Sequence, residues 1–418
     1  MSNLIPDGWS ENKIGNIASV FAGGTPSRSN LNYYIGSIPW VKSGEVNARQ
    51  IYSTNEHISE LAVKESSAKW APSGSILVAM YGATAGKVSK LMINATLNQA
   101  VSAINCHDGI ANNDYLLQAI EFNTEELLNT VQGSGQPNLS GQLIKGLSLL
   151  FPPLPEQQKI AAILTSVDDV IEKTQAQIDK LKDLKTGMMQ ELLTRGVGVD
   201  GKPHTEFKDS PVGRIPKGWD VLQLSELASF VTSGSRGWAQ YYSESGAIFI
   251  RIGNLTREHI NFRFKDTIYV TPPNSAEGKR TLVQTGDVLI SITADLGVIA
   301  VVNDDIGEAY VNQHVSLVRL NDLKISRWVG HFLSFEESQK QFTANNDSGA
   351  KAGLNLTAIR NMQVALPPIQ EMNQIVKALD SIDSSIAMKR TKLAKITDTK
   401  KALMQDLLTG KVRVKLDS

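Results

Sequence analysis

The sequence contains one cysteine, Cys106, and only six histidines among its 418 residues. A single cysteine excludes an internal disulfide framework and zinc sites built on paired cysteines. No apolar run approaches the roughly 20 residues that a membrane-spanning helix needs. The N-terminus also lacks the basic start and apolar stretch of a signal peptide. We therefore expect a soluble protein of a reducing compartment, the cytoplasm.

Catalytic signatures are missing as well. The sequence has no Gly-x-Gly-x-x-Gly cofactor turn and no Asn- or Asp-Pro-Pro-Tyr/Phe tetrapeptide. Segment 81–87 is not a phosphate-binding loop of the Walker type, because only three residues separate Gly82 from Gly86 and neither Ser nor Thr follows Lys87. Cys106 and His107 form an isolated adjacent pair, which is more typical of packing than of a nucleophile. The sequence therefore offers no catalytic residue and no set of metal ligands.

The overall composition is that of a globular protein. Apolar residues make up 41% of the chain and charged residues 20%, with 42 charges of each sign. This balance excludes a disordered or collagen-like chain. At about 100–200 residues per domain, the length predicts two to four domains.

The chain repeats itself. Ile-Pro-x-Gly-Trp occurs at 5–9 and again at 215–219, and Met-Gln-Glu/Asp-Leu-Leu-Thr occurs at 189–194 and at 404–409. Between these motifs, smaller matches such as Pro-Pro at 152–153 and 367–368 keep the same order. A collinear match of this length predicts two copies of one domain-sized module rather than a solenoid of short repeats.

Each copy has a β-rich part followed by a helical part. Short apolar runs between turn residues, such as 75–80 and 287–292, predict strands. After the Pro-Pro pair, the 39 residues 156–194 and 371–409 contain no proline and carry a heptad pattern. We expect a helix of about 58 Å in each copy, at roughly 1.5 Å per residue. The predicted seam consists of Ile160, Leu164, Val167, Ile171, Thr174, Ile178, Leu181, Lys185, Met188 and Leu192, and of Ile375, Leu379, Ile382, Ile386, Lys389, Leu393, Ile396, Lys400, Leu403 and Leu407.

Two lysines interrupt the apolar seam at equivalent positions. Lys185 and Lys400 are 215 residues apart, and a polar residue at such a position is costly but fixes register and orientation. We expect the two helices to pack on each other, because a long helix is unstable in water unless its apolar stripe is covered. The alternative is that each helix packs on its own neighbouring domain. Gly187 costs about 1 kcal/mol relative to Ala, but the heptad continues through it, so we expect no break.

This order of modules resembles the DNA-specificity subunit of type I restriction–modification systems over essentially the whole chain. The resemblance rests on a variable domain, Pro-Pro-Leu-Pro-Glu-Gln-Gln-Lys-Ile at 152–160, a second variable domain, and Leu-Pro-Pro-Ile at 366–369. The repeated openings and helix endings, and Phe-Ala-Gly-Gly-Thr-Pro-Ser at 21–27, belong to the same pattern.

The resemblance implies an α+β fold. Two pseudo-symmetric mixed α/β target-recognition domains are expected to be separated by two long antiparallel helices that form a coiled coil. The first target-recognition domain would comprise residues 1–153 and the central helical spacer residues 154–196. A linker and the second target-recognition domain would occupy residues 197–368, and the C-terminal helical spacer and tail residues 369–418.

The resemblance also implies a non-catalytic, cytoplasmic protein of a prokaryote. Each domain would recognise one half of an asymmetric bipartite site in double-stranded DNA, and the paired helices would set the spacer between the halves. Two modification subunits with adenine methyltransferase activity would dock on the chain, and two restriction (motor) subunits would join them. S-adenosylmethionine, ATP and Mg are expected on those partners, with no cofactor in this chain and no membrane association. Two other hypotheses remain: a self-contained DNA methyltransferase or nuclease, and a coiled-coil scaffold that binds protein or glycan.

Candidate DNA contacts lie in polar and glycine-rich segments, because loop residues of these types bind base edges and phosphates. In the first domain the candidates are Thr25, Ser27, Arg28, Lys42, Ser43, Tyr81, Thr84, Lys87, Gln136 and Asn138. In the second domain they are Ser235, Arg236, Arg251, Asn254, Thr293 and Lys351. For each segment the alternative is a plain turn between strands. The Asn-Gln pairs at 98–99 and 312–313 favour a structural role, because both copies keep them although the two half-sites should differ.

The charge of the two β-rich parts does not favour DNA. Residues 1–153 contain 9 basic and 11 acidic residues, and residues 197–368 contain 17 and 18. DNA-binding proteins normally present a basic face to the phosphates. Either the basic residues cluster on one side, or partner subunits supply most phosphate contacts. We favour a mixture of the two and expect weak DNA affinity for the isolated chain.

Overall fold

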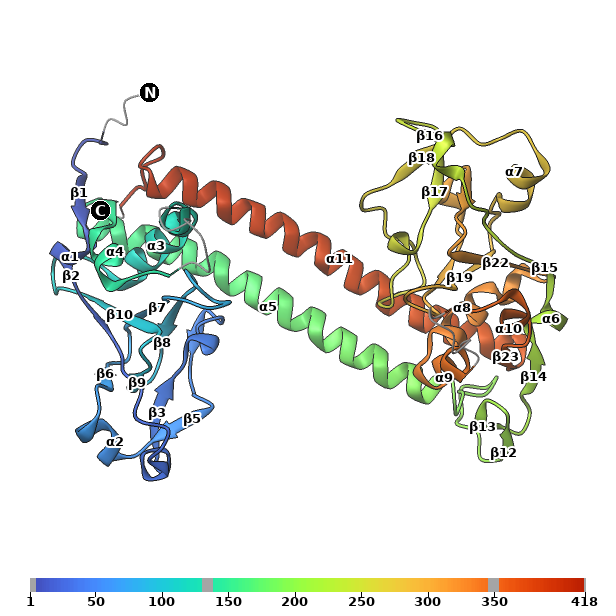
Figure 1. Ribbon diagram of the computed structural model, residues 1–418, viewed down its shortest axis with the longest axis horizontal. Helices are drawn as coiled ribbons and strands as arrows, with labels where there is room; N and C mark the ends of the chain where they lie inside the picture. Colours follow the sequence, from blue (N-terminus) through green and yellow to red (C-terminus); the bar gives the residue numbers. More distant parts are fainter. Residues whose placement is uncertain (1–4, 130–137, 345–352, 417–418) are drawn as a thin grey trace. The chain divides into compact units, whose positions relative to one another are not determined.

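The computed structural model describes residues 5–129, 138–344 and 353–416. The chain forms two compact units: unit 1 comprises residues 1–175 and 391–418, and unit 2 comprises residues 176–390. Figure 1 labels many of the helices and strands of both units, which are described separately below. In the described part of the chain, no helix is both long enough and apolar enough to span a membrane.

Unit 1 is built on small β-sheets. Its strands are β1 (Ser10–Lys13), β2 (Ala18–Ala22), β3 (Ile38–Val41), β4 (Gln50–Ile51), β5 (Glu56–Ile58), β6 (Lys69–Ala71), β7 (Ile76–Ala79), β8 (Val88–Leu91), β9 (Ala95–Leu97), β10 (Val101–Cys106) and β11 (Ser148–Phe151). Its short helices are α1 (Ile14–Ile17), η1 (Leu31–Tyr34), η2 (Ser43–Glu45), α2 (Glu60–Glu65), α3 (Asn113–Asn129) and α4 (Gly141–Gly146). The larger sheet has the order β2-β10-β7-β8-β4, the smaller one β5-β3-β9-β6, and β1 pairs with β11.

Unit 2 repeats this arrangement. Its strands are β12 (Phe207–Ser210), β13 (Gly213–Pro216), β14 (Asp220–Gln223), β15 (Ala228–Ser233), β16 (Tyr242–Ser243), β17 (Ala247–Ile250), β18 (Ile268–Val270), β19 (Val288–Ser291), β20 (Ile299–Val301), β21 (Ala309–Val311), β22 (Val315–Leu320) and β23 (Gln363–Leu366). Its short helices are α6 (Leu224–Leu227), η3 (Trp238–Tyr241), η4 (Ile252–Asn254), α7 (Ala276–Thr281), η5 (Asp304–Ile306), η6 (Leu323–Ile325), α8 (Ser326–Ser334), α9 (Glu336–Ala344) and α10 (Leu356–Arg360). The sheets have the orders β15-β22-β19-β20 and β16-β18-β17-β21, and β14 pairs with β23.

Strand directions confirm that the two units are copies of one fold. In unit 1, β3 pairs in parallel with β9 and antiparallel with β5. In unit 2, β17 pairs in parallel with β21 and antiparallel with β18. Since one irregular topology occurs twice in the same chain order, the duplication predicted from the sequence is confirmed.

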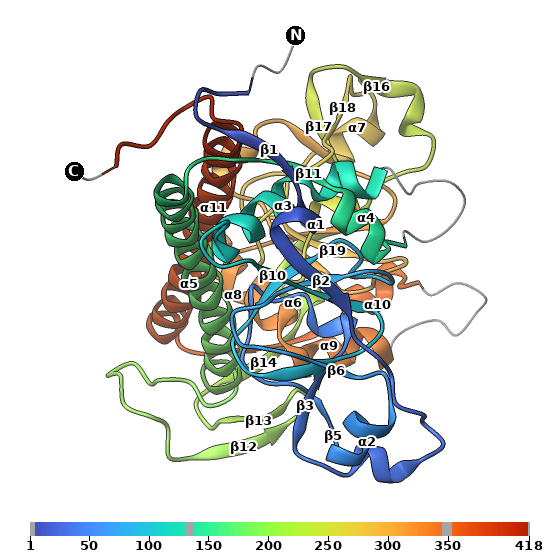
Figure 2. The same ribbon diagram turned by 90° about the vertical axis from the view of Figure 1, so that its left-hand side faces the viewer.

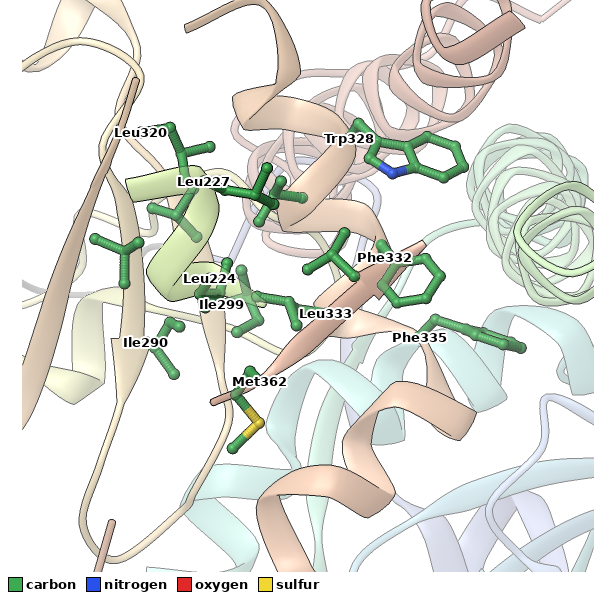
Figure 3. Packing of buried hydrophobic residues seen from close by; sticks show 14 of the residues in the cluster. Leu224, Leu227, Ile290, Ile299, Leu320, Trp328, Phe332, Leu333, Phe335 and Met362 are labelled. Carbon is green, nitrogen blue, oxygen red and sulfur yellow. The ribbon is translucent and has the colours of Figure 1, made fainter. Parts of the chain in front are cut away.

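The central strands β7 and β19, of the sheets β2-β10-β7-β8-β4 and β15-β22-β19-β20, are buried on both faces. In β19, Val288 and Ile290 belong to one apolar cluster and Leu289 to another, as the two-residue period of a strand requires. On one face of this sheet, Leu333 of α8 lies beside Ile299 and Leu224 (Figure 3). In unit 1, α3 covers the corresponding face of its sheet (Figure 2). The strands predicted within 75–80 and 287–292 are therefore confirmed as sheet centres.

Each copy ends in one long helix, as predicted. Helix α5 (Leu154–Leu192) has 39 residues and α11 (Ile369–Leu408) has 40. Helix α5 continues through Gly187 without a break. The helices also take part in the domain cores: Ile160 and Leu164 belong to the main cluster of unit 1, and Ile375 and Leu379 to that of unit 2.

Inside each unit the two helix segments pair antiparallel. In unit 2, Lys185 contacts Asp383 while Gln177, earlier in α5, contacts Lys389, later in α11. In unit 1, Ile160 near the start of α5 shares an apolar cluster with residues near the end of α11. Every predicted seam residue is buried or half-buried. The expected packing of the helices on each other is thus confirmed, and the alternative packing on a domain occurs as well.

Candidate nucleic-acid interface

In unit 1, Arg28 and Lys42 lie against a single carboxylate, that of Glu56. Lys42 follows β3 directly, and its Nζ lies 2.5 Å from Glu56 Oε1. Arg28 reaches the other oxygen of Glu56 at 2.7 Å. The Arg28 guanidinium also lies over the Tyr34 ring, 4.2 Å from its centroid, an arrangement that attracts a cation to the ring face. The structure therefore assembles two of the predicted DNA contacts around an acid that the sequence did not single out.

The charge of Glu56 follows from these contacts. The hydrogen bond from Lys42 is the largest influence on the pKa of Glu56 and lowers it, partial burial opposes this, and Arg28 lowers it further. The carboxylate is therefore ionised, and it neutralises part of the positive charge of Arg28 and Lys42.

The segment 81–87 lies beside the turn η2, which follows Lys42. Thr84 Oγ1 donates a hydrogen bond to the Ser43 carbonyl at 2.8 Å. Tyr81 forms a β-bridge with Asn138, and the Lys87 side chain is exposed. Candidates from three separated segments of the first domain thus lie in neighbouring loops.

The glycine-rich segment of the first domain has a structural explanation. A Cβ added at Gly23 would lie 2.1 Å from the Leu97 carbonyl oxygen, so the close approach is to the chain itself. The equivalent Gly234 is held in the same way, because its Cβ would lie 2.2 Å from the Val311 carbonyl oxygen. After these glycines, Thr25 is half-buried, whereas Ser27 is exposed and shares a hydrogen bond with Ser29 at 2.7 Å.

In unit 2, several candidates are engaged within the domain. Asn254 is only 2% exposed and accepts a hydrogen bond from the Arg251 backbone at 2.9 Å. Arg251 in turn donates to the Asp266 carbonyl at 3.0 Å. Ser235 accepts a hydrogen bond from Arg280 at 2.5 Å. Asn254 therefore shapes its turn and is not available to DNA in this conformation.

The remaining candidates of unit 2 differ in exposure. Arg236 is exposed. Thr293 shares a hydrogen bond with His314 Nδ1 at 2.8 Å and forms a β-bridge with Gly353, the counterpart of the bridge between Tyr81 and Asn138. Two candidates, Gln136 and Lys351, lie outside the described residues.

The repeated Asn-Gln pairs have the expected structural role at their asparagines. Asn98 Oδ1 accepts from the Ala100 backbone and Asn312 Oδ1 accepts from the His314 backbone, each at 3.0 Å. The same turn is therefore closed in the same way in both domains.

Sequence reasoning missed the partners of the candidate cations. Glu56 binds Arg28 and Lys42, and Arg280 binds Ser235, yet neither residue stands in a motif. Their partners are distant in sequence, so only the fold reveals them. Within the described residues, no group of three or more His, Cys, Asp or Glu side chains could hold a metal ion.

Comparison with known proteins identifies one family. The family model described as the type I restriction modification DNA specificity domain matches residues 6–183 and again residues 216–398. The chain is 26% identical over 421 residues to the type I restriction enzyme MjaVIII specificity subunit of Methanocaldococcus jannaschii, covering 98% of this chain and 94% of that protein. It is 28% identical over 161 residues to the EcoR124I/EcoR124II specificity subunit of Escherichia coli, covering 37% and 40% of the two chains.

Solved structures show the same fold. The S subunit of a type I restriction–modification system from M. genitalium aligns with a TM-score of 0.62 at 14% identity, over 98% of this chain and 97% of that chain. A chain from a structural study of complex assembly and conformational transition of the type I R-M system aligns with a TM-score of 0.54 at 17% identity, over 98% and 100%.

Proposed function

The chain belongs to the family of type I restriction–modification DNA specificity proteins, and from this premise we propose how it recognises its target. It is a specificity subunit, which recognises DNA sequence and assembles with other subunits of its system. It is not itself the enzyme, because the catalytic activities of such systems lie in partner subunits.

Each of the two domains recognises one half of a bipartite site. The observation that carries this proposal is the duplicated fold with different loops at equivalent places. Unit 1 presents Arg28 and Lys42 around Glu56, whereas unit 2 presents Arg236 beside Ser235 and Arg280. Because the loop chemistry differs, the two half-sites differ and the whole site is asymmetric. Residues 1–153 and 197–368 would be the recognition domains.

The long helices set the spacer between the half-sites. A helix of about 58 Å at roughly 1.5 Å per residue is long enough for domains one DNA turn of about 34–36 Å apart. Each mismatched base pair costs about 1–3 kcal/mol, so one domain alone discriminates weakly. Two tethered domains combine their discrimination.

Two modification subunits dock on the chain. The duplicated fold supports this number, because any docking surface in one unit has an equivalent in the other. The modification subunits would bind S-adenosylmethionine, and restriction subunits, where present, would bind ATP and Mg. Phosphate contacts from these partners would offset the near-neutral charge of the chain, whose Arg28 and Lys42 are already paired with Glu56. A cytoplasmic location stays a prediction.

Co-expression with the neighbouring modification subunit tests this proposal. Sequencing of methylated adenines should give an asymmetric motif of two parts with one spacer length, and the modification subunit alone should give none. Methylation that does not depend on this chain would contradict the proposal. S-adenosylmethionine binding by the purified chain would support the enzyme hypothesis instead.

A further inference from the structure

The two seam lysines make the same ion pair in the two units. Lys185 Nζ lies 2.6 Å from Asp383 Oδ1 in unit 2, and Lys400 Nζ lies 2.8 Å from Asp168 Oδ1 in unit 1. Each of the four residues stands 215 positions from its counterpart. Their exposed fractions are only 9%, 4%, 7% and 7%, in the order named. One buried contact between the helices therefore occurs twice.

Each lysine also binds the domain of its own unit. In unit 2, Lys185 Nζ donates to the Glu258 carbonyl at 2.7 Å. The Glu258 carboxylate is held by both terminal nitrogens of Arg390 on α11, at 2.6 and 2.8 Å. The segment around Glu258 is thereby attached to both helices.

In unit 1, Lys400 likewise binds both the other long helix and the domain, through different residues. Lys400 Nζ lies 2.9 Å from Glu121 on α3. Arg49 bridges the two acids, at 3.0 Å from Glu121 and 2.6 Å from Asp168. Gln118 donates to the second oxygen of Asp168 at 2.7 Å.

The attached segments are equivalent parts of the two domains. Arg49 stands four residues after the end of η2, and Glu258 stands four residues after the end of η4. These turns carry the candidate DNA contacts Lys42 and Arg251. In unit 2 the seam lysine itself bonds the chain that follows the candidate DNA-binding turn. In unit 1 the two acids that bind Lys400, Asp168 and Glu121, also bind Arg49 of that chain.

Stability alone does not explain these pairs. Burying an ion pair costs desolvation, and well-packed apolar residues in its place are often as stable or more stable. Register explains them better, because sliding α11 by one heptad would bring Val376 or Arg390 opposite Lys185. In unit 1 the same slide would bring Leu393 or Leu407 opposite Asp168. Both shifts leave a buried charge without its partner.

We infer that Lys185 and Lys400, with Asp383 and Asp168, are positioning residues. They hold the helices in one register and fix each domain's DNA-contacting turn on the helix pair, so that the half-sites are recognised at one spacer length. This inference rests on the proposed function of the helices.

The test uses the full chain with its modification subunit and reads the spacer lengths of methylated sites. In K185M/D383L or K400M/D168L the half-site bases should stay unchanged. Sites with a spacer shorter or longer by a base pair should gain methylation roughly tenfold over the wild-type level, as expected for the loss of one pairwise coupling. The thermal unfolding midpoint should fall little, because apolar side chains fill the seam.

Two variants serve as controls. Lys185→Arg keeps the charge and the donors, so the single spacer should be retained. Lys401→Met removes an exposed lysine next to Lys400 and should change nothing. The two double variants probe the same contact in different units, so either one carries the test if the other does not accumulate.

Failure of this inference and failure of the proposed function give different results. A folded, active double variant that keeps one spacer length would overturn the inference, and so would one whose half-site bases change. A wild-type complex that methylates no bipartite site would instead overturn the proposed function.

Discussion

At the scale of single residues, the contacts of Asp380 predict how stability depends on pH. Arg327 binds both oxygens of Asp380 at 2.6 Å, and His331 Nε2 lies 2.8 Å from one of them. Burial would raise the pKa of Asp380, but the hydrogen bonds from His331 and Arg327 outweigh it and hold the pKa at about 2. The Asp380 carboxylate is therefore protonated at a lower pH in the folded protein than in the unfolded chain.

The sign of the effect follows from this lowered pKa. The stabilisation is present above the unfolded value of 3.8 and is lost as pH falls from there towards about 2. It amounts to about 2 kcal/mol. The unfolding free energies of the wild type and Asp380→Asn should therefore differ most above about pH 4 and converge near about pH 2. A difference that does not change over this interval would contradict the assignment.

Sequence could predict the seam lysines but not their partners. Lys185 and Lys400 fall on heptad positions, so the pattern places them in the seam. Asp168 and Asp383 each come directly after a seam position, where an acid is usually solvated. Asp168 is bound by Gln118 and Arg49 of the neighbouring domain, which are distant from it in sequence, so no local pattern predicts these contacts.

At the scale of elements, two glycines near the end of α5 predict opposite effects of alanine. A Cβ at Gly187 meets nothing within 4 Å, and the residue lies inside the helix. Gly187→Ala should therefore stabilise the protein by about 1 kcal/mol through helix propensity. Gly196 has φ +65°, and its Cβ would lie 2.2 Å from Glu371 Oε1, so Gly196→Ala should destabilise it by more than about 1 kcal/mol. Urea unfolding measures both.

Two results would contradict the prediction for Gly187→Ala and Gly196→Ala. Equal midpoint shifts for the two variants, or a loss of stability in Gly187→Ala, would mean that the end of α5 is not packed as described.

Elements with strong periodicity were predictable, and those set by long-range contacts were not. The long helices and the strands β7 and β19 follow from apolar spacing alone. The hairpin of β12 and β13 lies near the start of residues 197–368, where the linker was expected. Its neighbouring chain is held by Glu371, which accepts from the Val197 and Gly198 backbones at 2.9 and 3.0 Å. No local pattern encodes such a contact.

At the scale of the whole molecule, comparison of the two halves of the sequence predicted more of the fold than any single motif did. Segments of similar sequence adopt similar folds. The ordered matches between the two halves, such as Ile-Pro-x-Gly-Trp at 5–9 and at 215–219, therefore already predicted two equivalent domains. The loops that carry the candidate DNA contacts differ between the two domains, because the two copies of the sequence diverge there. Arg28 and Arg236 lie in matching segments and both are exposed, but Arg28 is paired with Glu56.

We propose that each domain recognises its own half of the site. Exchange of residues 1–153 for the equivalent part of the MjaVIII specificity subunit, followed by sequencing of methylated adenines, measures this directly. We expect one half of the motif to change while the other half stays as in the parent chain. A motif that changes in both halves, or in neither, would contradict recognition of one half-site by each domain.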